Sequence, residues 1–217
     1  MTLKRLLGNA GGRMRVLAVA PHPDDLEIGC GGTLIKLARA GHEIFLALMT
    51  RGDAGGNPAV RRREQEAAAR LYKARRIFWL GFEDTRVPLT KESIDALDKV
   101  MREVKADLVF ANHAEDTHQD HRNTASQVLS ATRYTQNVLF YEVPTSVNFS
   151  PDVFVDISPV LQDKLRALRL HKSQVNKVNV ADLSIIDCAR SMAQFRGFQG
   201  RVKAAEGFKA LRLLLQA

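Results

Sequence analysis

Cysteine is scarce in this sequence, with Cys30 and Cys188 the only two among 217 residues. Two thiols cannot build the disulfide framework that holds small secreted domains together. We therefore expect a reducing, cytoplasmic location. Long apolar runs are also missing, because no stretch approaches the roughly 20 residues that span a bilayer. The sequence predicts neither a transmembrane helix nor a stable membrane anchor.

Acidic residues are outnumbered by basic ones, 24 to 32, and the formal net charge is +8. A basic excess can serve nucleic acid, an anionic membrane or an acidic substrate. Here the basic residues are dispersed, and their densest cluster, RRRE at 61–64, opens an expected helix. Aromatic residues do not alternate with basic ones, as they would in a single-strand binder. We interpret the charge as solvated surface and expect no nucleic-acid partner.

A single domain accounts for most of the chain. A length of 217 residues, 45% of them hydrophobic, is enough for one α/β core. Residues 1–13, MTLKRLLGNAGGR, are basic and lack the continuous apolar region of a signal peptide. We expect them to form a loose leader or a short docking helix, and residues 14–217 to form the domain.

Short apolar runs alternate with helical patterns along the chain. The expected strands are Val16–Ala20, Ile44–Met49, Ile77–Leu80, Leu108–Ala111, Val138–Tyr141 and Val153–Val155. The expected helices are Thr33–Ala40, Ala59–Tyr72, Lys91–Val104, His121–Thr132 and Pro159–His171, with one or two more beyond Gln174. This alternation predicts βαβ units. The expected fold is α/β: a Rossmann-like, doubly wound, mostly parallel sheet with helices on both faces.

Polar segments follow the first four expected strands. In open α/β sheets the functional loops lie beyond the carboxyl ends of the strands. The four segments are PHPDD, TRGDAGG, GFEDTR and NHAEDTHQDH, in chain order. We expect them to converge on one edge of the sheet.

The segment PHPDDLEIGCGG, residues 21–32, allows two interpretations. Its glycines follow a strand and precede a helix, as in a dinucleotide-binding turn. However, the spacing in IGCGGT departs from the G-x-G-x-x-G pattern, and the preceding carboxylates would repel a pyrophosphate. We favour the second interpretation, in which the glycines let the start of the helix pack close to the sheet.

Histidine and aspartate gather in two of the loops, as HPDD at 22–25 and HQDH at 118–121. Such residues can supply three ligands to Zn²⁺ and leave a position open for water, as a catalytic zinc site requires. Another carboxylate could accept the proton of that water, and a free histidine could stabilise an oxyanion. Either motif alone is also typical of an ordinary turn or cap. Their occurrence together, each after a strand at the same sheet edge, favours a metal site.

Three further polar side chains are less distinctive. Arg61 lies near the start of an expected helix, with Glu64 three residues later. This spacing favours a helical charge pair over an arginine directed into the site. His42 and His171 are expected at the surface or at a helix end.

The pair PHPDDLE and HQDH resembles the motifs A/P-H-P-D-D-x-E and H-x-D-H of the LmbE-like or PIG-L family of zinc-dependent N-acetylglucosaminyl deacetylases. Two further elements strengthen the resemblance: T-x-G-D after the second strand, and FVDIS-x-x-x-x-x-K-x-x-A-L-x-x-x-x-SQ near Asp156. The resemblance extends from about Arg15 to the EGF at 206–208, and so covers nearly the whole chain.

The resemblance implies roles for the residues of the first motif. His22 and Asp25 match metal ligands, and His121 of the second motif matches the third ligand. Asp24 matches the general base that activates the metal-bound water. The cofactor expected from the resemblance is Zn²⁺.

The resemblance also implies supporting roles. His118 matches the histidine that stabilises the tetrahedral intermediate and assists departure of the amine. Asp120 matches the carboxylate that orients this histidine. Arg61 matches an arginine that helps to shape the site in some members. Gln119 stands where many members have Pro, and Lys73 stands where a Gly often ends the second helix.

The expected function is removal of the acetyl group from an N-acetylglucosamine-type substrate, giving acetate and a free amino sugar. The resemblance also implies a homo-oligomer, as a trimer or hexamer. One alternative is another metal-dependent hydrolase, such as an esterase or a two-metal phosphatase. A second alternative is a non-catalytic module that binds sugar or nucleic acid, motivated by the high pI of about 9.8.

Overall fold

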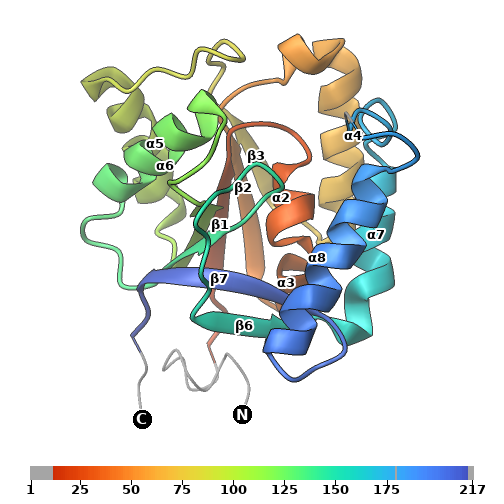
Figure 1. Cartoon of the computed structure of the whole chain (residues 1–217). Coiled ribbons are helices and arrows are strands. Elements are labelled where there is room, and N and C mark those ends of the chain that lie inside the picture. The colour runs from red at the N-terminus through yellow and green to blue at the C-terminus, as the bar shows by residue number, and fades with distance from the viewer. Residues whose placement is uncertain (1–11, 179, 215–217) are drawn as a thin grey trace.

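Seven strands build one sheet in the computed structural model, which describes residues 12–178 and 180–214 (Figure 1). The strands are β1 (Arg15–Ala20), β2 (Glu43–Leu48), β3 (Arg76–Trp79), β4 (Leu108–Asn112), β5 (Val138–Tyr141), β6 (Val153–Asp156) and β7 (Ala205–Arg212). Their order across the sheet is β3-β2-β1-β4-β5-β7-β6. The first five in that order run parallel, whereas β7 is antiparallel to both β5 and β6.

Helices cover both faces of the sheet (Figure 1). They are α2 (Asp25–Gly29), α3 (Gly31–Arg39), α4 (Pro58–Leu71), α5 (Lys91–Val104), α6 (Gln119–Ala131), α7 (Leu161–Arg169) and α8 (Ile185–Gln199), with short 3-10 turns at Asp53–Gly55 and Ser158–Val160. The side chains of Asn57, Thr90 and Ser184 cap α4, α5 and α8 by accepting N–H groups of the first turn. Within the described ranges, none of these helices is long and apolar enough to cross a membrane.

Strand β1 shows how the core is divided. Val16 and Ala18 belong to the apolar cluster that includes α3, α7 and α8, whereas Leu17 and Val19 belong to the cluster that includes α5 and α6. Alternate side chains of a strand point to opposite faces of the sheet. A continuous apolar run is therefore what a strand covered on both faces requires. The expected doubly wound α/β fold is confirmed.

The C-terminal part differs from the expectation of one or two helices beyond Gln174. Helix α8 forms, but Ala205–Arg212 forms β7, which lies between β5 and β6. Its buried positions include Glu206 and Gly207, so the segment lacks the apolar run that marks the other strands. The leader expected at residues 1–13 falls almost wholly on residues 1–11, outside the described part of the chain.

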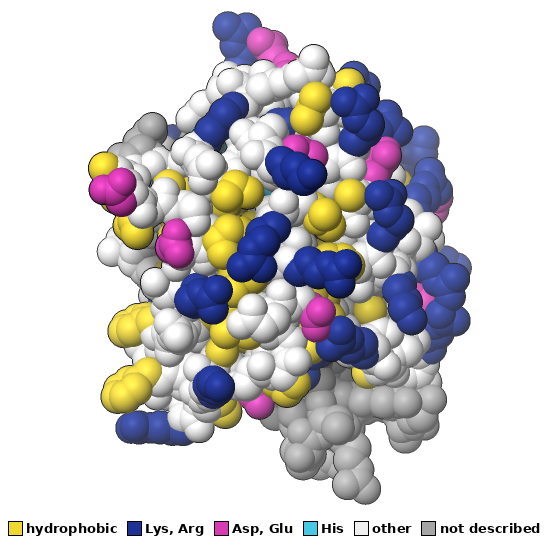
Figure 2. Space-filling view, turned by 90° about the vertical axis from the view of Figure 1, so that its right-hand side faces the viewer, with side chains coloured by type: hydrophobic (Ala, Val, Ile, Leu, Met, Phe, Trp, Pro, Cys, Tyr) yellow, Lys and Arg dark blue, Asp and Glu magenta, His cyan; other side chains and the backbone are white. Residues whose placement is uncertain are grey.

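The face of the molecule formed by α4, α7 and α8 is rich in basic side chains (Figure 2). Exposed arginines there include Arg62, Arg63 and Arg70 of α4 and Arg166 and Arg169 of α7. Figure 2 shows the basic side chains dispersed among polar and apolar ones. Positive charge is therefore spread over this helical surface and is not gathered in one patch of it.

Candidate metal centre and active site

The four loops that follow β1 to β4 meet at the carboxyl edge of the sheet, as expected. The Ala54 N–H, after β2, donates to Asp84 Oδ2, after β3, at 2.8 Å. The Thr85 N–H, in that same third loop, donates to Asp120 Oδ2 at 2.7 Å. These contacts connect consecutive loops into one polar site.

The turn after β1 sends neighbouring side chains in different directions. Asp24 has a φ of 93°, which is uncommon for a residue other than glycine. Asp25 begins α2, and its Oδ2 atom accepts the backbone N–H of His22 at 2.9 Å. The Asp25 carboxylate and the His22 ring therefore face the same point, whereas the Asp24 carboxylate faces α4.

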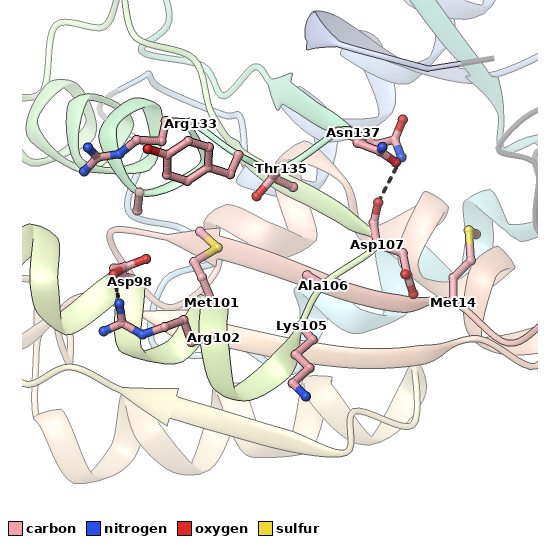
Figure 3. Close-up of a pocket in the computed structure, with 13 residues that line it drawn as sticks. Met14, Asp98, Met101, Arg102, Lys105, Ala106, Asp107, Arg133, Thr135 and Asn137 are labelled. Atoms are coloured by element: carbon pink, nitrogen blue, oxygen red, sulfur yellow. Dashed lines mark hydrogen bonds and ion pairs between the residues drawn. The ribbon is translucent and has the colours of Figure 1, made fainter. Parts of the chain in front are cut away.

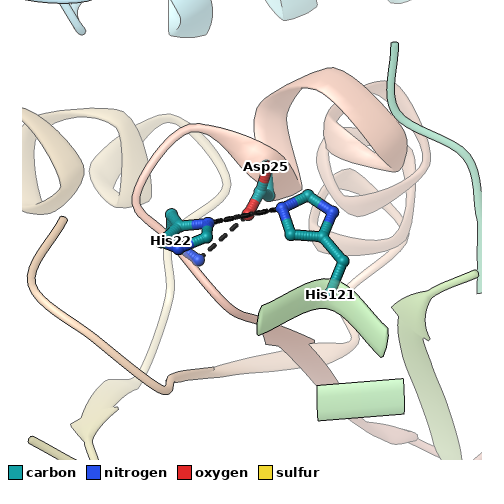
Figure 4. A group of neighbouring side chains, drawn as sticks. All are labelled: His22, Asp25 and His121. Atoms are coloured by element: carbon teal, nitrogen blue, oxygen red, sulfur yellow. Dashed lines mark hydrogen bonds and ion pairs between the residues drawn. The ribbon is translucent and has the colours of Figure 1, made fainter. Parts of the chain in front are cut away.

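Three side chains from two distant motifs come together here (Figure 4). His22 Nδ1 lies 3.4 Å from Asp25 Oδ2 and 3.3 Å from His121 Nε2, and the latter lies 3.5 Å from the same carboxylate oxygen. When a metal ion has tetrahedral coordination and metal–ligand bonds of about 2.0–2.2 Å, its ligand atoms lie about 3.3–3.6 Å from one another. Two imidazole nitrogens and one carboxylate oxygen also suit a divalent transition metal. The geometry fits a metal ion held by these three residues.

We call the three atoms His22 Nδ1, Asp25 Oδ2 and His121 Nε2 the metal triangle. A carboxylate lies beside the other ring nitrogen of each of its histidines. His22 Nε2 is 3.0 Å from Asp120 Oδ2 and 3.0 Å from Asp84 Oδ1, and His121 Nδ1 is 3.2 Å from Asp116 Oδ2. Such partners fix the orientation and tautomer of a ring whose other nitrogen binds metal. Burial alone would lower the pKa of His22, but the surrounding carboxylates raise it well above its usual value.

Neither Asp84 nor Asp116 stands out in the sequence as a candidate site residue. Asp84 belongs to GFEDTR and Asp116 to NHAEDTHQDH, and both segments follow strands at this edge. Their place in these loops is the signal that could have identified them. Spacing alone does not reveal which carboxylates of a polar loop turn inwards.

Arg61 is directed into the site, so the expectation that favoured a charge pair with Glu64 is wrong. Arg61 Nη2 lies 3.3 Å from Asp24 Oδ2, and the arginine is buried. Glu64 instead accepts hydrogen bonds from the N–H and hydroxyl of Ser173. Burial raises the pKa of Asp24 to about 6, although the charge of Arg61 acts in the opposite direction.

Glycines of the loop after β2 enclose the Arg61 guanidinium. A Cβ at Gly52 would lie 2.6 Å from Arg61 Cζ, and a Cβ at Gly55 would lie 2.3 Å from Arg61 Nη1. Arg61 Nη1 donates to the Gly52 carbonyl oxygen at 3.3 Å. The carbonyl oxygen of Gly55 accepts from Gln174 Nε2 at 3.2 Å. Gln174, in the SQ element, thus holds the loop after β2 in place. This loop has room for the Arg61 guanidinium because glycine stands at positions 52 and 55.

His118 lines the pocket from the N-cap position of α6. Its Nδ1 atom accepts the Asp120 backbone N–H at 3.1 Å, so we assign the proton of a neutral ring to Nε2. Burial and the nearby His22 lower the pKa of His118, which favours that neutral form. The Asp120 carboxylate lies against His22 and accepts the N–H groups of Thr85 and Val87. The Asp120 carboxylate was expected to orient His118, but it contacts His22 instead, and Asp120 contacts His118 through its backbone N–H.

Gly29 and Gly32 of the first motif serve close packing, as expected. A Cβ at Gly29 would lie 2.0 Å from the ring of Tyr141. The Gly32 N–H donates to the buried Glu206 carboxylate at 2.8 Å. Glu206 also accepts from the buried Lys164 Nζ at 2.6 Å. The start of α3 is therefore anchored by an ion pair from β7 and α7.

His42 and His171 are buried, so a surface position is wrong for both. His42 Nδ1 accepts the Met14 N–H at 3.1 Å. His171 lies just beyond the end of α7, and its Nε2 atom is 3.2 Å from Glu27 Oε2. The helix-end position expected for His171 is confirmed.

A pocket of about 200 Å³ opens over the candidate site. It is small, and polar side chains supply much of its wall. The lining residues are His22, Asp24, Ala54, Gly55, Arg61, Asp84, Thr85 and His118.

A larger hollow of about 580 Å³ lies at the opposite, amino edge of the sheet (Figure 3). Its carboxylates are engaged within the fold. Asp98 pairs with Arg102, and Asp107 accepts the Arg15 N–H at 2.7 Å. Among the described residues, the clusters that could bind a metal lie at the carboxyl edge and not here.

Comparisons with known proteins agree with the geometry. The family described as PIG-L, GlcNAc-PI de-N-acetylase, matches residues 17–132, which include both histidine motifs. The chain belongs to the PIG-L family. An Escherichia coli (strain K12) member, described as the uncharacterized deacetylase YaiS, is 34% identical over 177 residues, which cover 77% of this chain and 96% of that one.

Two other PIG-L relatives carry named substrates. Diacetylchitobiose deacetylase of Thermococcus kodakarensis is 31% identical over 186 residues, which cover 74% of this chain and 70% of the relative. The structure of N,N'-diacetylchitobiose deacetylase from Pyrococcus horikoshii, in complex with its inhibitor MPG, has a TM-score of 0.81 at 30% identity. That match covers 94% of this chain and 86% of the other. The resemblance inferred from the motifs is confirmed.

Proposed function

We propose that this PIG-L protein is a zinc-dependent hydrolase that removes the acetyl group of an N-acetylglucosamine-type substrate, releasing acetate and a free amino sugar. The observation that carries the proposal is the triangle of His22 Nδ1, Asp25 Oδ2 and His121 Nε2, whose sides measure 3.3–3.5 Å. A half-buried Asp24 lies beside this triangle and is not part of it. The relatives named as deacetylases of N-acetylated sugars support the same reaction.

Zinc is the metal that we propose for this centre. Two histidines and one carboxylate are a ligand set of catalytic zinc hydrolases, in which one position stays open. When bound, zinc would polarise the amide carbonyl and lower the pKa of a coordinated water. His22, Asp25 and His121 would hold it, and the carboxylates behind the two histidines would keep the rings in place.

Asp24 is the proposed general base. A carboxylate whose pKa is raised to about 6 is largely ionised at neutral pH, yet it accepts a proton more readily than an ordinary aspartate. It can therefore take a proton from the water that attacks the amide carbon. Arg61, 3.3 Å away, restricts where the carboxylate can turn and supports the assignment.

His118 is the proposed partner of the substrate oxygen. Its Nε2–H can donate to the negative oxygen that forms as the carbonyl carbon becomes tetrahedral. The proton taken up by Asp24 then passes to the nitrogen with the assistance of His118, so that the amine leaves when the C–N bond breaks. Asp120 supports this role by fixing the His118 ring through its backbone N–H.

A panel of N-acetylglucosamine derivatives, including N,N'-diacetylchitobiose, tests the proposed function. Released acetate and free amine are measured with the zinc-loaded protein, with and without a chelator. We expect equal amounts of both products, and their loss when the chelator removes the metal. Hydrolysis of simple acetate esters or phosphate esters, with no amine released from any N-acetyl sugar, would contradict the proposal.

We propose that the protein acts in the cytoplasm as a homo-oligomer, as a trimer or hexamer. Phe195 and Phe198 of α8 support association, because they are 58% and 75% exposed on the isolated chain. The free thiols of Cys30 and Cys188 are compatible with a reducing compartment. Sedimentation of the wild type and of Phe198→Asp tests the first point, and cell fractionation tests the second. A monomeric wild type, or recovery outside the cytoplasm, would contradict them.

A further inference from the structure

Gln65 is a fully buried side chain of α4 that the proposed reaction does not use. It lies four residues after Arg61, so the two side chains share one face of the helix. Arg61 contacts the Asp24 carboxylate, and Gln65 Oε1 accepts the Asp24 backbone N–H at 3.2 Å. One face of α4 therefore contacts both the side chain and the backbone of Asp24.

Asp24 needs this support because its φ of 93° lies in a sparsely populated region for a residue with a side chain. Such a conformation persists only where the surroundings determine it. Asp24 is also the N-cap of α2, and its own side chain makes no capping hydrogen bond. The Asp24 N–H points to α4, where Gln65 provides its acceptor.

The carboxamide of Gln65 is itself held in one orientation. Its Nε2 atom donates to Glu27 Oε1 at 2.9 Å and to the Tyr72 hydroxyl oxygen at 3.3 Å. The Tyr72 hydroxyl in turn donates to Glu27, whose other oxygen lies 3.2 Å from His171 Nε2. Because a backbone N–H can only donate, the carboxamide oxygen must face Asp24 and the NH₂ group must face Glu27. These buried neighbours leave Gln65 no other arrangement that satisfies its partners.

We propose that Gln65 is a positioning residue: it holds Asp24 in the positive-φ conformation that places the Asp24 carboxylate beside Arg61, in the wall of the pocket over the metal triangle. This inference rests on the proposed role of Asp24 as the general base. Gln65 itself neither lines the pocket nor belongs to the metal triangle, and it contacts the site through the backbone of Asp24. Its loss should therefore slow turnover without weakening the binding of zinc or substrate.

The test compares Gln65→Met with the matched variant Gln127→Met. Gln127 is also fully buried, but it belongs to α6 and its Nε2 atom donates to the Pro88 carbonyl oxygen at 2.6 Å. With equal zinc content, Gln65→Met should reduce kcat by about 100-fold, the loss expected from a misplaced catalytic group. Its KM should change by less than about twofold, because substrate contacts remain. Gln127→Met should keep the wild-type kcat.

Gln65→Asn provides a second variant if the methionine variant does not fold. Asparagine stays polar but is one methylene shorter, so it cannot reach the Asp24 N–H. It should show the same fall in kcat with unchanged KM. A wild-type kcat in either folded variant, or a loss confined to KM, would overturn the proposal.

A crystal structure of the folded Gln65 variant separates this proposal from the proposed function. We expect the φ of Asp24 to leave the positive region once its N–H has lost its acceptor. Retention of a positive φ would overturn the positioning role, even if the wild type released no amine from any N-acetyl sugar. Failure of the wild type to release amine would contradict the proposed function alone.

Discussion

The Nε2 atom of His121 lies 3.3 Å from the Nδ1 atom of His22, although 99 positions separate the two residues in the chain. The order of the sheet explains the contact. Strand β4 pairs directly with β1, while β2 and β3 lie on the other side of β1. The loop after β1 and the start of α6 therefore meet at one edge, and Asp25 completes the metal triangle.

Replacement of His121 by alanine should abolish tight zinc binding. It removes one of the three proposed ligand atoms, so we expect zinc affinity to fall by more than about 100-fold, a larger loss than that typical of residues that only support the ligands. Competition with a coloured chelator measures the affinity. His113→Ala is the matched control, because His113 follows the same strand and stands outside the metal triangle. Full zinc affinity in His121→Ala would contradict the ligand assignment.

Asp24→Asn should retain zinc and lose turnover. The amide has nearly the same shape as the carboxylate but cannot accept the proton, so kcat should fall by about 10²- to 10⁴-fold. Steady-state kinetics at matched zinc content measures the loss. Asp53→Asn serves as a control, because Asp53 is an exposed carboxylate of the neighbouring loop. Near wild-type activity of Asp24→Asn would remove Asp24 from the role of base.

The pH dependence of kcat/KM should report the ionisation of Asp24. Its pKa is raised to about 6, so the base is ionised above that pH and protonated below it. Activity should therefore fall as the pH decreases through about 6. The pKa of Asp25 is lowered to about 2, which keeps this proposed ligand ionised over the same range.

Arg61→Met should move the pH at which activity falls, the acidic limb of the profile, to a higher value. The reason is that the positive charge of Arg61 lowers the pKa of Asp24. Rates measured at saturating zinc between about pH 5 and 8 give the profile. A limb that moves to lower pH, or does not move, would contradict the pairing of Arg61 with Asp24.

Gly55→Ala should impair activity more than stability. The added Cβ would lie 2.3 Å from Arg61 Nη1, so the guanidinium must move away from Asp24. We expect kcat to fall by about 10- to 100-fold, with little change in the unfolding midpoint. Gly31→Ala is the control, since its Cβ would meet the Leu26 carbonyl oxygen at an ordinary 3.5 Å. Equal activity of both variants would show that the loop does not confine Arg61.

Lys164→Met should destabilise the fold. It leaves the Glu206 carboxylate buried without its cation, which costs about 3–5 kcal/mol of unfolding free energy. The double variant Lys164→Met/Glu206→Gln should be more stable than the single one, because the unpaired charge is gone. Denaturant unfolding measures both. Lys91→Met, which breaks the exposed pair with Asp95, should leave the midpoint unchanged. A Lys164→Met midpoint equal to that of Lys91→Met would contradict this account.

Strands buried on both faces could be predicted from the sequence, whereas β7 could not. In β1 every residue after Arg15 is buried and apolar, so the strand can be recognised from its own sequence, without knowledge of its tertiary contacts. In β7 the buried positions include Glu206, whose charge is balanced by Lys164 from α7. The polarity of that strand makes sense only when the tertiary contact is known.

The candidate site also has parts that could be predicted from the sequence and parts that could not. A candidate metal site could be predicted because two dense motifs stand at the ends of expected strands, and the resemblance to the PIG-L family pointed to His22, Asp25 and His121 as its ligands. The direction of Arg61 could not be predicted from spacing, since Glu64 is its neighbour in the sequence and Asp24 becomes its neighbour only after folding; only the resemblance placed Arg61 at the site. The contact of Gln65 with Asp24 could not be predicted either. No local sequence feature distinguishes a buried glutamine that accepts a distant N–H from a glutamine on a helix surface.

Anomalous diffraction at the zinc edge, from crystals of the zinc-loaded protein, tests the central claim most directly. We predict one strong peak within about 2.0–2.2 Å of His22 Nδ1, Asp25 Oδ2 and His121 Nε2. The Asp24 carboxylate should lie beside this peak without ligating it. A peak held instead by His118 and Asp120, or zinc bound only elsewhere on the chain, would contradict the account.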